Sequence, residues 1–348
     1  MKRGTKPTKL SEKMKKAAKN KPAKKKQYDG DMETTISTGS TLLDLAISGG
    51  RKRGGGLPNH ILVEIFGPSG SGKTVLLSEI AGAIQRAGGE IVFNDPEARL
   101  NKQFASLFDF DVDNITYLQP DTVTELFEQL KDWEPTGKIN GIIADSLAAL
   151  STNMEMDKKE GDKMGMRRAK EFSEGLRKTC RILKPKNMIM VCSNQVRTNA
   201  DAGAFTEKYT TPGGVSIGFY SSVRLQVRPV RKIQEETTVA GKKVKRVVGI
   251  ESNVRVYKNS VWKPYREAPL IILFDYGIDD VQANLQFIKD YTRNTTYTVA
   301  GESVGVSMEK AIQTVETDGL ESVLREEVID LWQEIESKFE KERKPKQR

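Results

Sequence analysis

A glycine-rich stretch, FGPSGSGKTVLLSEI at residues 66–80, carries the residue types that hold a nucleotide phosphate. It fits the pattern G-x-x-x-x-G-K-[ST], and the residues expected to contact the nucleotide are Gly67, Pro68, Ser69, Gly70, Ser71, Gly72, Lys73, Thr74 and Val75. The glycines let successive backbone N–H groups turn toward one phosphate at a helix N-terminus, where the helix dipole also favours negative charge. The lysine would reach the β- and γ-phosphates, and the threonine hydroxyl would bind Mg²⁺. A chance glycine turn is the alternative, but the full pattern stands between an apolar run and a helical pattern and therefore predicts nucleotide binding.

Polar side chains follow three further apolar runs. In GIIADS the apolar strand ends on Asp145, as expected of a carboxylate that holds Mg²⁺ through water, although aspartate is also a common turn former. In FNDPEARL, Glu97 could polarise the attacking water, with Asp95 as a rival and an ordinary exposed glutamate as the alternative. Asn194 and Gln195 end CSNQ, where an amide could hydrogen-bond a γ-phosphate or simply cap the strand.

An alternating pattern of strands and helices must position these groups. Apolar runs at 61–66, 91–93, 115–118, 141–145 and 188–193 are mostly separated by helical stretches, which predicts a parallel α/β sheet with its ligands at the carboxyl edge. Antiparallel strands joined by a basic turn follow, and helical patterns return from Asp279 onward. We therefore expect a basic N-terminal arm at 1–32, a core at 33–278, a small C-terminal domain at 279–340 and a basic tail at 341–348.

Composition limits the function classes. The 348 residues are 37% hydrophobic and 30% charged, enough for a sizeable core. No apolar run approaches the roughly 18 residues of a membrane helix, and the basic start lacks the apolar stretch of a signal peptide, so we expect a cytoplasmic protein without a membrane partner. Cys180 and Cys192 are read as reduced core residues, and the single histidine, His60, excludes a zinc site and histidine-based catalysis.

The net charge of +9 is unevenly distributed. Residues 1–27 carry +11 and residues 341–348 carry +4, which leaves a mildly acidic body. Such tails contact polyanions or merely add solubility. Within the first tail, apolar residues at helical spacing from Leu10 to Ala18 offer another interpretation, a short helix that docks on a partner subunit.

The order of several short motifs carries a resemblance to a known family. ISTGSTLLDLAI, GPSGSGKT, NDPEARL, LQPDT, ADSLAAL, GDKMG, SNQVRT, TPGG, FYSSVRL and VYKNS follow one another as in the RecA family of homologous-recombination ATPases, and most closely as in its bacterial and phage members. The resemblance covers roughly residues 33–280 and is weaker in the C-terminal helices. It implies a RecA-like P-loop ATPase core with a mostly parallel central sheet, an antiparallel extension and a small C-terminal α/β domain.

The resemblance also implies an activity. ATP binding with Mg²⁺ would stabilise a helical filament of many copies on single-stranded DNA, which pairs with homologous double-stranded DNA and exchanges strands, and hydrolysis would release it. The implied roles are catalysis by Lys73, phosphate sensing by Gln195, Mg²⁺ binding by Thr74 and Asp145, water activation by Glu97, and adenine stacking by Phe104, where the family commonly has tyrosine.

Two loops would hold the DNA, at about 152–166 and 196–213. The resemblance places Met164 as an apolar wedge between bases, and Arg177, Arg197, Gly213 and Gly214 on the DNA. Small and basic residues near the nucleotide suit a grip on the phosphate backbone, whereas plain surface loops are the alternative.

The sequence departs from the family pattern at three places. The tail KERKPKQR is basic where bacterial members usually have an acidic one, and the N-terminal segment is richer in lysine. The family has a pair of lysines that reach the ATP of the neighbouring subunit. Lys258 matches the first, and the resemblance implies that it is catalytic in trans. Ser260 stands in place of the second, and Lys263 is the candidate to replace it. Two other functions therefore remain open: a RecA-fold hexameric helicase motor, and a DNA-binding filament protein with little ATP turnover.

Overall fold

The computed structural model describes residues 32, 34–152, 164–198, 209–210, 215–341 and 343. Met32–Arg348 forms one compact unit, and residues 1–31, with the helix expected there, lie outside the described part of the chain. All elements below belong to the unit Met32–Arg348.

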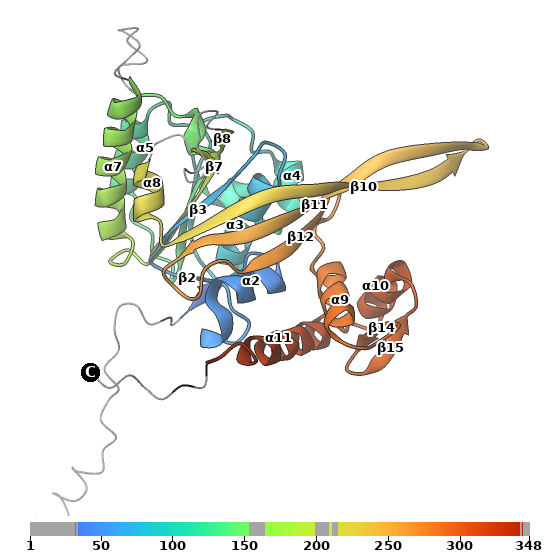
Figure 1. Cartoon of the computed structure of the whole chain (residues 1–348). Helices are drawn as coiled ribbons and strands as arrows, with labels where there is room; N and C mark the ends of the chain where they lie inside the picture. The colour runs from blue at the N-terminus through green and yellow to red at the C-terminus, as the bar shows by residue number, and fades with distance from the viewer. Residues whose placement is uncertain are drawn as a thin grey trace, which may run out of the picture. The chain divides into compact units, whose positions relative to one another are not determined.

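A nine-stranded sheet with the order β13-β12-β11-β10-β3-β7-β6-β4-β5 forms the centre of this unit (Figure 1). Its parallel half contains β3 (Leu62–Gly67), β4 (Ile91–Asn94), β5 (Thr116–Leu118), β6 (Asn140–Ala144) and β7 (Met188–Gln195). On the other side of β3, β10 (Val223–Val239) pairs with it in parallel. The strands from β3 to β7 coincide with the five apolar runs, which confirms the predicted α/β core.

Helices cover both faces of the parallel half, and this explains why β3, β4 and β6 are buried throughout. Alternate strand residues belong to two separate cores. One core includes α3 (Lys73–Arg86) and α2 (Thr41–Ser48); the other includes α5 (Val123–Asp132), α7 (Met164–Ile182) and α8 (Val215–Tyr220). The strands are thus packed between two layers of helices, and their carboxyl ends share one edge.

The antiparallel half continues from β10 through β11 (Lys242–Asn259) and β12 (Glu267–Leu273) to β13 (Gly277–Ile278). Between Gln234 and Val247 the β10–β11 ribbon is almost entirely exposed, and it extends away from the rest of the sheet in Figure 1. Its turn consists of Ala240 and Gly241, both with positive φ, which matches the twist that a tight hairpin needs.

The C-terminal segment contains α9 (Asp280–Tyr291), β14 (Tyr297–Val299), β15 (Glu302–Gly305), α10 (Met308–Thr317) and α11 (Glu321–Ser337). The rings of Trp332 in α11 and Trp262 lie 5.3 Å apart, and Glu336 accepts a 2.7 Å hydrogen bond from Arg266. Trp262 and Arg266 follow β11, so these contacts attach α11 to the antiparallel half of the sheet.

The smaller elements are β1 (Thr35–Ile36), η1 (Gly49–Arg51), β2 (Leu57–Pro58), α4 (Lys102–Ser106), η2 (Val112–Asn114), η3 (Leu147–Ala149), β8 (Arg197–Thr198) and β9 (Tyr209–Thr210). Across the part of the chain that the structure describes, no helix combines the length and apolar character needed to cross a membrane.

Candidate active site

A cavity of about 390 Å³ opens at the carboxyl edge of the parallel strands. The residues that line it are Ser69, Gly70, Ser71, Gly72, Lys73, Thr74, Val75, Glu97, Arg99, Asn101, Phe104, Asp145, Ser146, Ser193, Gln195, Ile250, Ile272 and Phe274. The glycine loop, the carboxylates of Glu97 and Asp145, the amide of Gln195 and the ring of Phe104 thus line one cavity.

The glycine loop is supported from behind by the antiparallel strands. A Cβ at Gly67 would lie 2.2 Å from the carbonyl oxygen of Val227 in β10. Gly72 has a φ of +98°, and a Cβ there would lie 2.3 Å from Ile272 Cδ1 in β12. Ser252 Oγ in β11 donates a 2.9 Å hydrogen bond to the Ser71 carbonyl. The loop needs glycine because neighbouring strands occupy the space of a side chain.

Lys73 lies at the start of α3 with its ammonium against the loop. Its Nζ donates hydrogen bonds to the carbonyl oxygens of Gly67 at 3.1 Å and Pro68 at 2.8 Å. Burial lowers the pKa of Lys73, and the carboxylates of Asp145 and Glu97 oppose this shift. A phosphate on the loop would offer this buried cation an anionic partner in place of neutral carbonyls.

Thr74 and Asp145 present oxygen ligands side by side. Thr74 Oγ1 donates a 2.7 Å hydrogen bond to Asp145 Oδ2, and Ser193 Oγ donates to Asp145 Oδ1. Hydroxyl and carboxylate oxygens suit Mg²⁺, which keeps several waters and uses substrate phosphates as further ligands. The described residues contain no group of three His, Cys, Asp or Glu side chains arranged for a metal, so phosphate and water would complete the coordination. Sequence reasoning missed Ser193, whose only signal is a hydroxyl within an apolar strand.

Glu97 and Asp95 differ in their surroundings. Glu97 lines the cavity and pairs with Arg99 at 2.9 Å. Asp95 is 2% exposed, and its Oδ2 accepts hydrogen bonds from the backbone N–H groups of Arg99 at 2.7 Å and Leu100 at 2.8 Å and from the Tyr117 hydroxyl at 3.0 Å. Asp95 therefore organises the loop that presents Glu97.

Phe104 lies on the short helix α4, whose N-cap Asn101 accepts a 2.8 Å hydrogen bond from the Phe104 N–H. The ring packs edge-on against Phe108 with centroids 5.0 Å apart and lines the cavity. Further apolar lining comes from Ile250 and Ile272 in β11 and β12, which no sequence motif marks.

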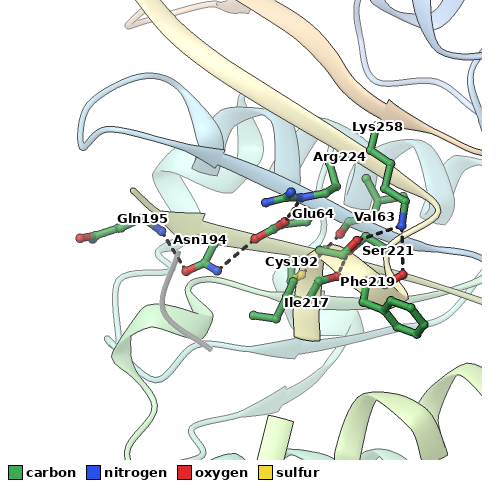
Figure 2. Close-up of polar contacts among 11 residues, drawn as sticks. Val63, Glu64, Cys192, Asn194, Gln195, Ile217, Phe219, Ser221, Arg224 and Lys258 are labelled. Carbon is green, nitrogen blue, oxygen red and sulfur yellow. Dashed lines mark hydrogen bonds and ion pairs between the residues drawn. The ribbon is translucent and has the colours of Figure 1, made fainter. Parts of the chain in front are cut away.

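The two amides at the end of β7 differ in position (Figure 2). Gln195 is exposed and lines the cavity, whereas Asn194 is buried and accepts a 3.0 Å hydrogen bond from the Gln195 N–H. Asn194 Nδ2 donates to Glu64 Oε1 at 3.1 Å, and Arg224 Nε donates to Glu64 Oε2 at 2.6 Å. Sequence reasoning missed this buried pair, although a glutamate inside the apolar run 61–66 was a signal.

Lys258 lies away from the cavity lining of its own chain. Its Nζ donates to the carbonyl oxygens of Gly218 at 2.9 Å and Phe219 at 3.0 Å in α8 (Figure 2). Burial, followed by the nearby Arg224 cation, lowers the pKa of Lys258, and Glu64 opposes this. Lys263 instead pairs with Glu336 at 3.4 Å.

The structure describes the residues expected on DNA only in part. Arg177 is exposed on α7. Met164 begins α7 and Arg197 begins β8, but their side chains are outside the described residues, as are Gly213, Gly214, most of both expected loops and nearly all of the basic tail.

Comparison with known families covers the same region. A family model described as the RecA N-terminal domain matches residues 9–279. This range contains the phosphate loop, every other residue that lines the cavity, and Lys258. The match extends over well more than half of the chain and agrees with the mostly parallel sheet, and we conclude that the chain belongs to the RecA family.

Proposed function

We propose that this RecA-family protein is a DNA-dependent ATPase that forms helical filaments on single-stranded DNA and catalyses homologous pairing and strand exchange. Family membership indicates a RecA-like recombinase or ATPase, and the filament and its DNA transactions are the proposal. The observation that supports it best is the convergence of Lys73, Thr74, Asp145, Glu97 and Gln195 on one cavity.

The residues divide the work of hydrolysis. Lys73 would neutralise phosphate charge, and Phe104 would stack on adenine. Thr74 and Asp145 would hold Mg²⁺, which when bound draws charge from phosphate oxygens. Glu97 would take a proton from the attacking water. It lines the cavity, whereas the carboxylate of Asp95 is occupied by hydrogen bonds from the following turn.

Coupling to DNA would begin at Gln195. Its amide lines the cavity, and the chain continues from it into the loop at 196–213, so loss of a γ-phosphate contact could change the loop. Arg177, Arg197, Gly213 and Gly214 would contact the DNA, with Met164 between bases. The phosphate backbone supplies most of such an interaction, and affinity should therefore fall as salt rises.

Electron microscopy with ATP and single-stranded DNA tests the assembly. Continuous helical filaments would support the recombinase, whereas closed rings would support the hexameric motor. A strand-displacement assay then compares a homologous duplex with a heterologous duplex of equal length. Displacement of both duplexes alike, or of neither, would contradict homologous exchange.

A filament protein with little turnover is the second candidate. Ser260 cannot supply the second cation, and Lys258 is engaged by α8 in the isolated chain. Phosphate release with and without DNA distinguishes the two functions, because only the ATPase should be stimulated by DNA.

A further inference from the structure

We infer that Glu64 and Arg224 are positioning residues that link the end of α8 to Gln195. The inference rests on the proposed role of Gln195 as the γ-phosphate sensor. It assigns to a buried ion pair, remote from the cavity lining, the task of holding that sensor at a defined position.

The first step concerns the burial of the pair. Glu64 has no exposed side-chain surface, and the Arg224 side chain is 14% exposed. Both carboxylate oxygens of Glu64 are used, one by Asn194 and the other by Arg224. A buried carboxylate is costly unless paired, so a residue of this type inside an otherwise apolar strand makes the geometry around it specific.

The second step concerns the orientation of the Asn194 amide. Its Oδ1 accepts the Gln195 N–H, and its Nδ2 donates to Glu64. A flipped amide would put two donors together at Gln195 and two acceptors together at Glu64. Glu64 therefore selects the amide orientation that holds the backbone of Gln195.

The third step concerns the other end of the pair. The Arg224 guanidinium lies over the rings of Phe66 at 4.7 Å and Tyr257 at 5.4 Å. It also packs against Gly218 in α8, where an added Cβ would lie 3.0 Å from Nη1. A shift of α8 would therefore move Arg224, and through Glu64 and Asn194 it would reach Gln195.

The direction of this coupling follows from the chain order. The helix α8 begins directly after the second segment expected to bind DNA, and its carbonyls at Gly218 and Phe219 hold Lys258. One helix end thus meets both the Arg224 guanidinium and the lysine expected to serve the neighbouring nucleotide. DNA binding and contact with a neighbouring subunit can therefore both change the position of Gln195 through the end of α8.

Arg224→Lys tests the link while it keeps the charge. Lysine lacks the planar fork that contacts Glu64 and both rings together. We expect DNA-stimulated kcat to fall about ten-fold, as positioning contacts commonly modulate coupling, with KM for ATP changed by no more than about two-fold. Arg228→Lys is the matched control, since Arg228 lies on the same strand in an exposed pair with Glu267 at 2.9 Å. An unchanged stimulation in folded Arg224→Lys would overturn the inference.

A swapped pair separates positioning from mere stability. Glu64→Gln should also lower the stimulated kcat. The double variant Glu64→Gln with Asn194→Asp keeps one carboxylate and one amide, and it can rebuild the hydrogen bonds to the Gln195 N–H and to Arg224. It should recover at least half of the lost stimulation. Failure to recover, when circular dichroism shows the double variant folded, would contradict the relay.

Gly218→Ala covers the case in which the Glu64 variants do not fold. The added methyl group should displace the guanidinium from α8 and lower the stimulated kcat without changing nucleotide affinity; full stimulation in this variant would also refute the link.

Gln195→Ala separates this inference from the proposed function. Stimulation that survives Gln195→Ala removes the sensor role itself, whereas stimulation lost in Gln195→Ala but kept in Arg224→Lys removes only the relay.

Discussion

Two neighbouring carboxylates should respond differently to replacement: Glu97→Gln should lower ATP turnover, and Asp95→Asn should lower the stability of the fold. Glu97 lines the cavity, so glutamine removes the proton acceptor and leaves most of the shape unchanged. General-base catalysis contributes about 10²–10⁴ in rate, so turnover should fall at least about 100-fold, or roughly 3 kcal/mol of barrier. The variant also breaks the Glu97–Arg99 pair, in which Arg99 is 68% exposed, and such a pair contributes only about 0–1 kcal/mol to stability.

Asp95→Asn should instead weaken the fold. Its carboxylate oxygen accepts two backbone N–H groups and one tyrosine hydroxyl in a buried setting. Hydrogen bonds to a charged group contribute about 1.5–3 kcal/mol each, and asparagine keeps one acceptor oxygen, so we expect a loss of about 2–3 kcal/mol in the free energy of unfolding. Residual turnover should track the fraction of folded protein.

Three measurements decide between these roles: phosphate release at saturating ATP and DNA, binding of a fluorescent ATP analogue, and urea unfolding. Glu97→Gln should lose turnover alone, and Asp95→Asn should lose stability. The assignment is wrong if Glu97→Gln loses nucleotide affinity in proportion to turnover. It is also wrong if fully folded Asp95→Asn shows the larger loss of turnover.

Three further predictions concern the subunit boundary, the tails and pH. Lys258→Ala should keep ATP binding yet lower DNA-stimulated turnover and filament length, and mixing with Glu97→Gln protomers should restore part of the turnover; no recovery in co-assembled filaments would exclude a role in trans. Deletion of 1–27 and 341–348 should flatten the slope of log affinity against log salt if the tails contact phosphates, and an unchanged slope would point to assembly or solubility. Burial raises the pKa of Glu79 from 4.5 to about 7, so folding favours the protonated carboxyl group. The free energy of unfolding should therefore decrease as pH rises from about 4.5, the pKa in the unfolded chain, to about 7. Glu79→Gln should remove this decrease and gain about 3 kcal/mol at pH 8 in urea unfolding, whereas an unchanged pH dependence would contradict it.

Much of the nucleotide site was predictable because its signals are local. The phosphate loop is one contiguous pattern, and the inner strands β3, β4 and β6 are short apolar runs whose burial on both faces leaves a continuous hydrophobic signature. Because parallel strands share a carboxyl edge, Asp145 and Gln195 could be expected beside the loop, and both line its cavity. The residues expected on DNA stay predictions, since most lie outside the described part of the chain.

Other features depend on contacts between distant segments, which no local pattern encodes. The sequence offers Asp95 and Glu97 as rival candidates for the same role. Only the hydrogen bonds that Asp95 accepts from the following turn and from β5 distinguish the two residues. The support of Gly72 by Ile272 and the pairing of Glu64 with Arg224 likewise join residues far apart in the chain. Lys258 reads as an ordinary strand-end lysine until the end of α8 supplies its carbonyl partners. The identity of a side chain sets what chemistry it can perform, but its partners and burial, which arise when separate strands and helices pack together, determine which chemistry it performs.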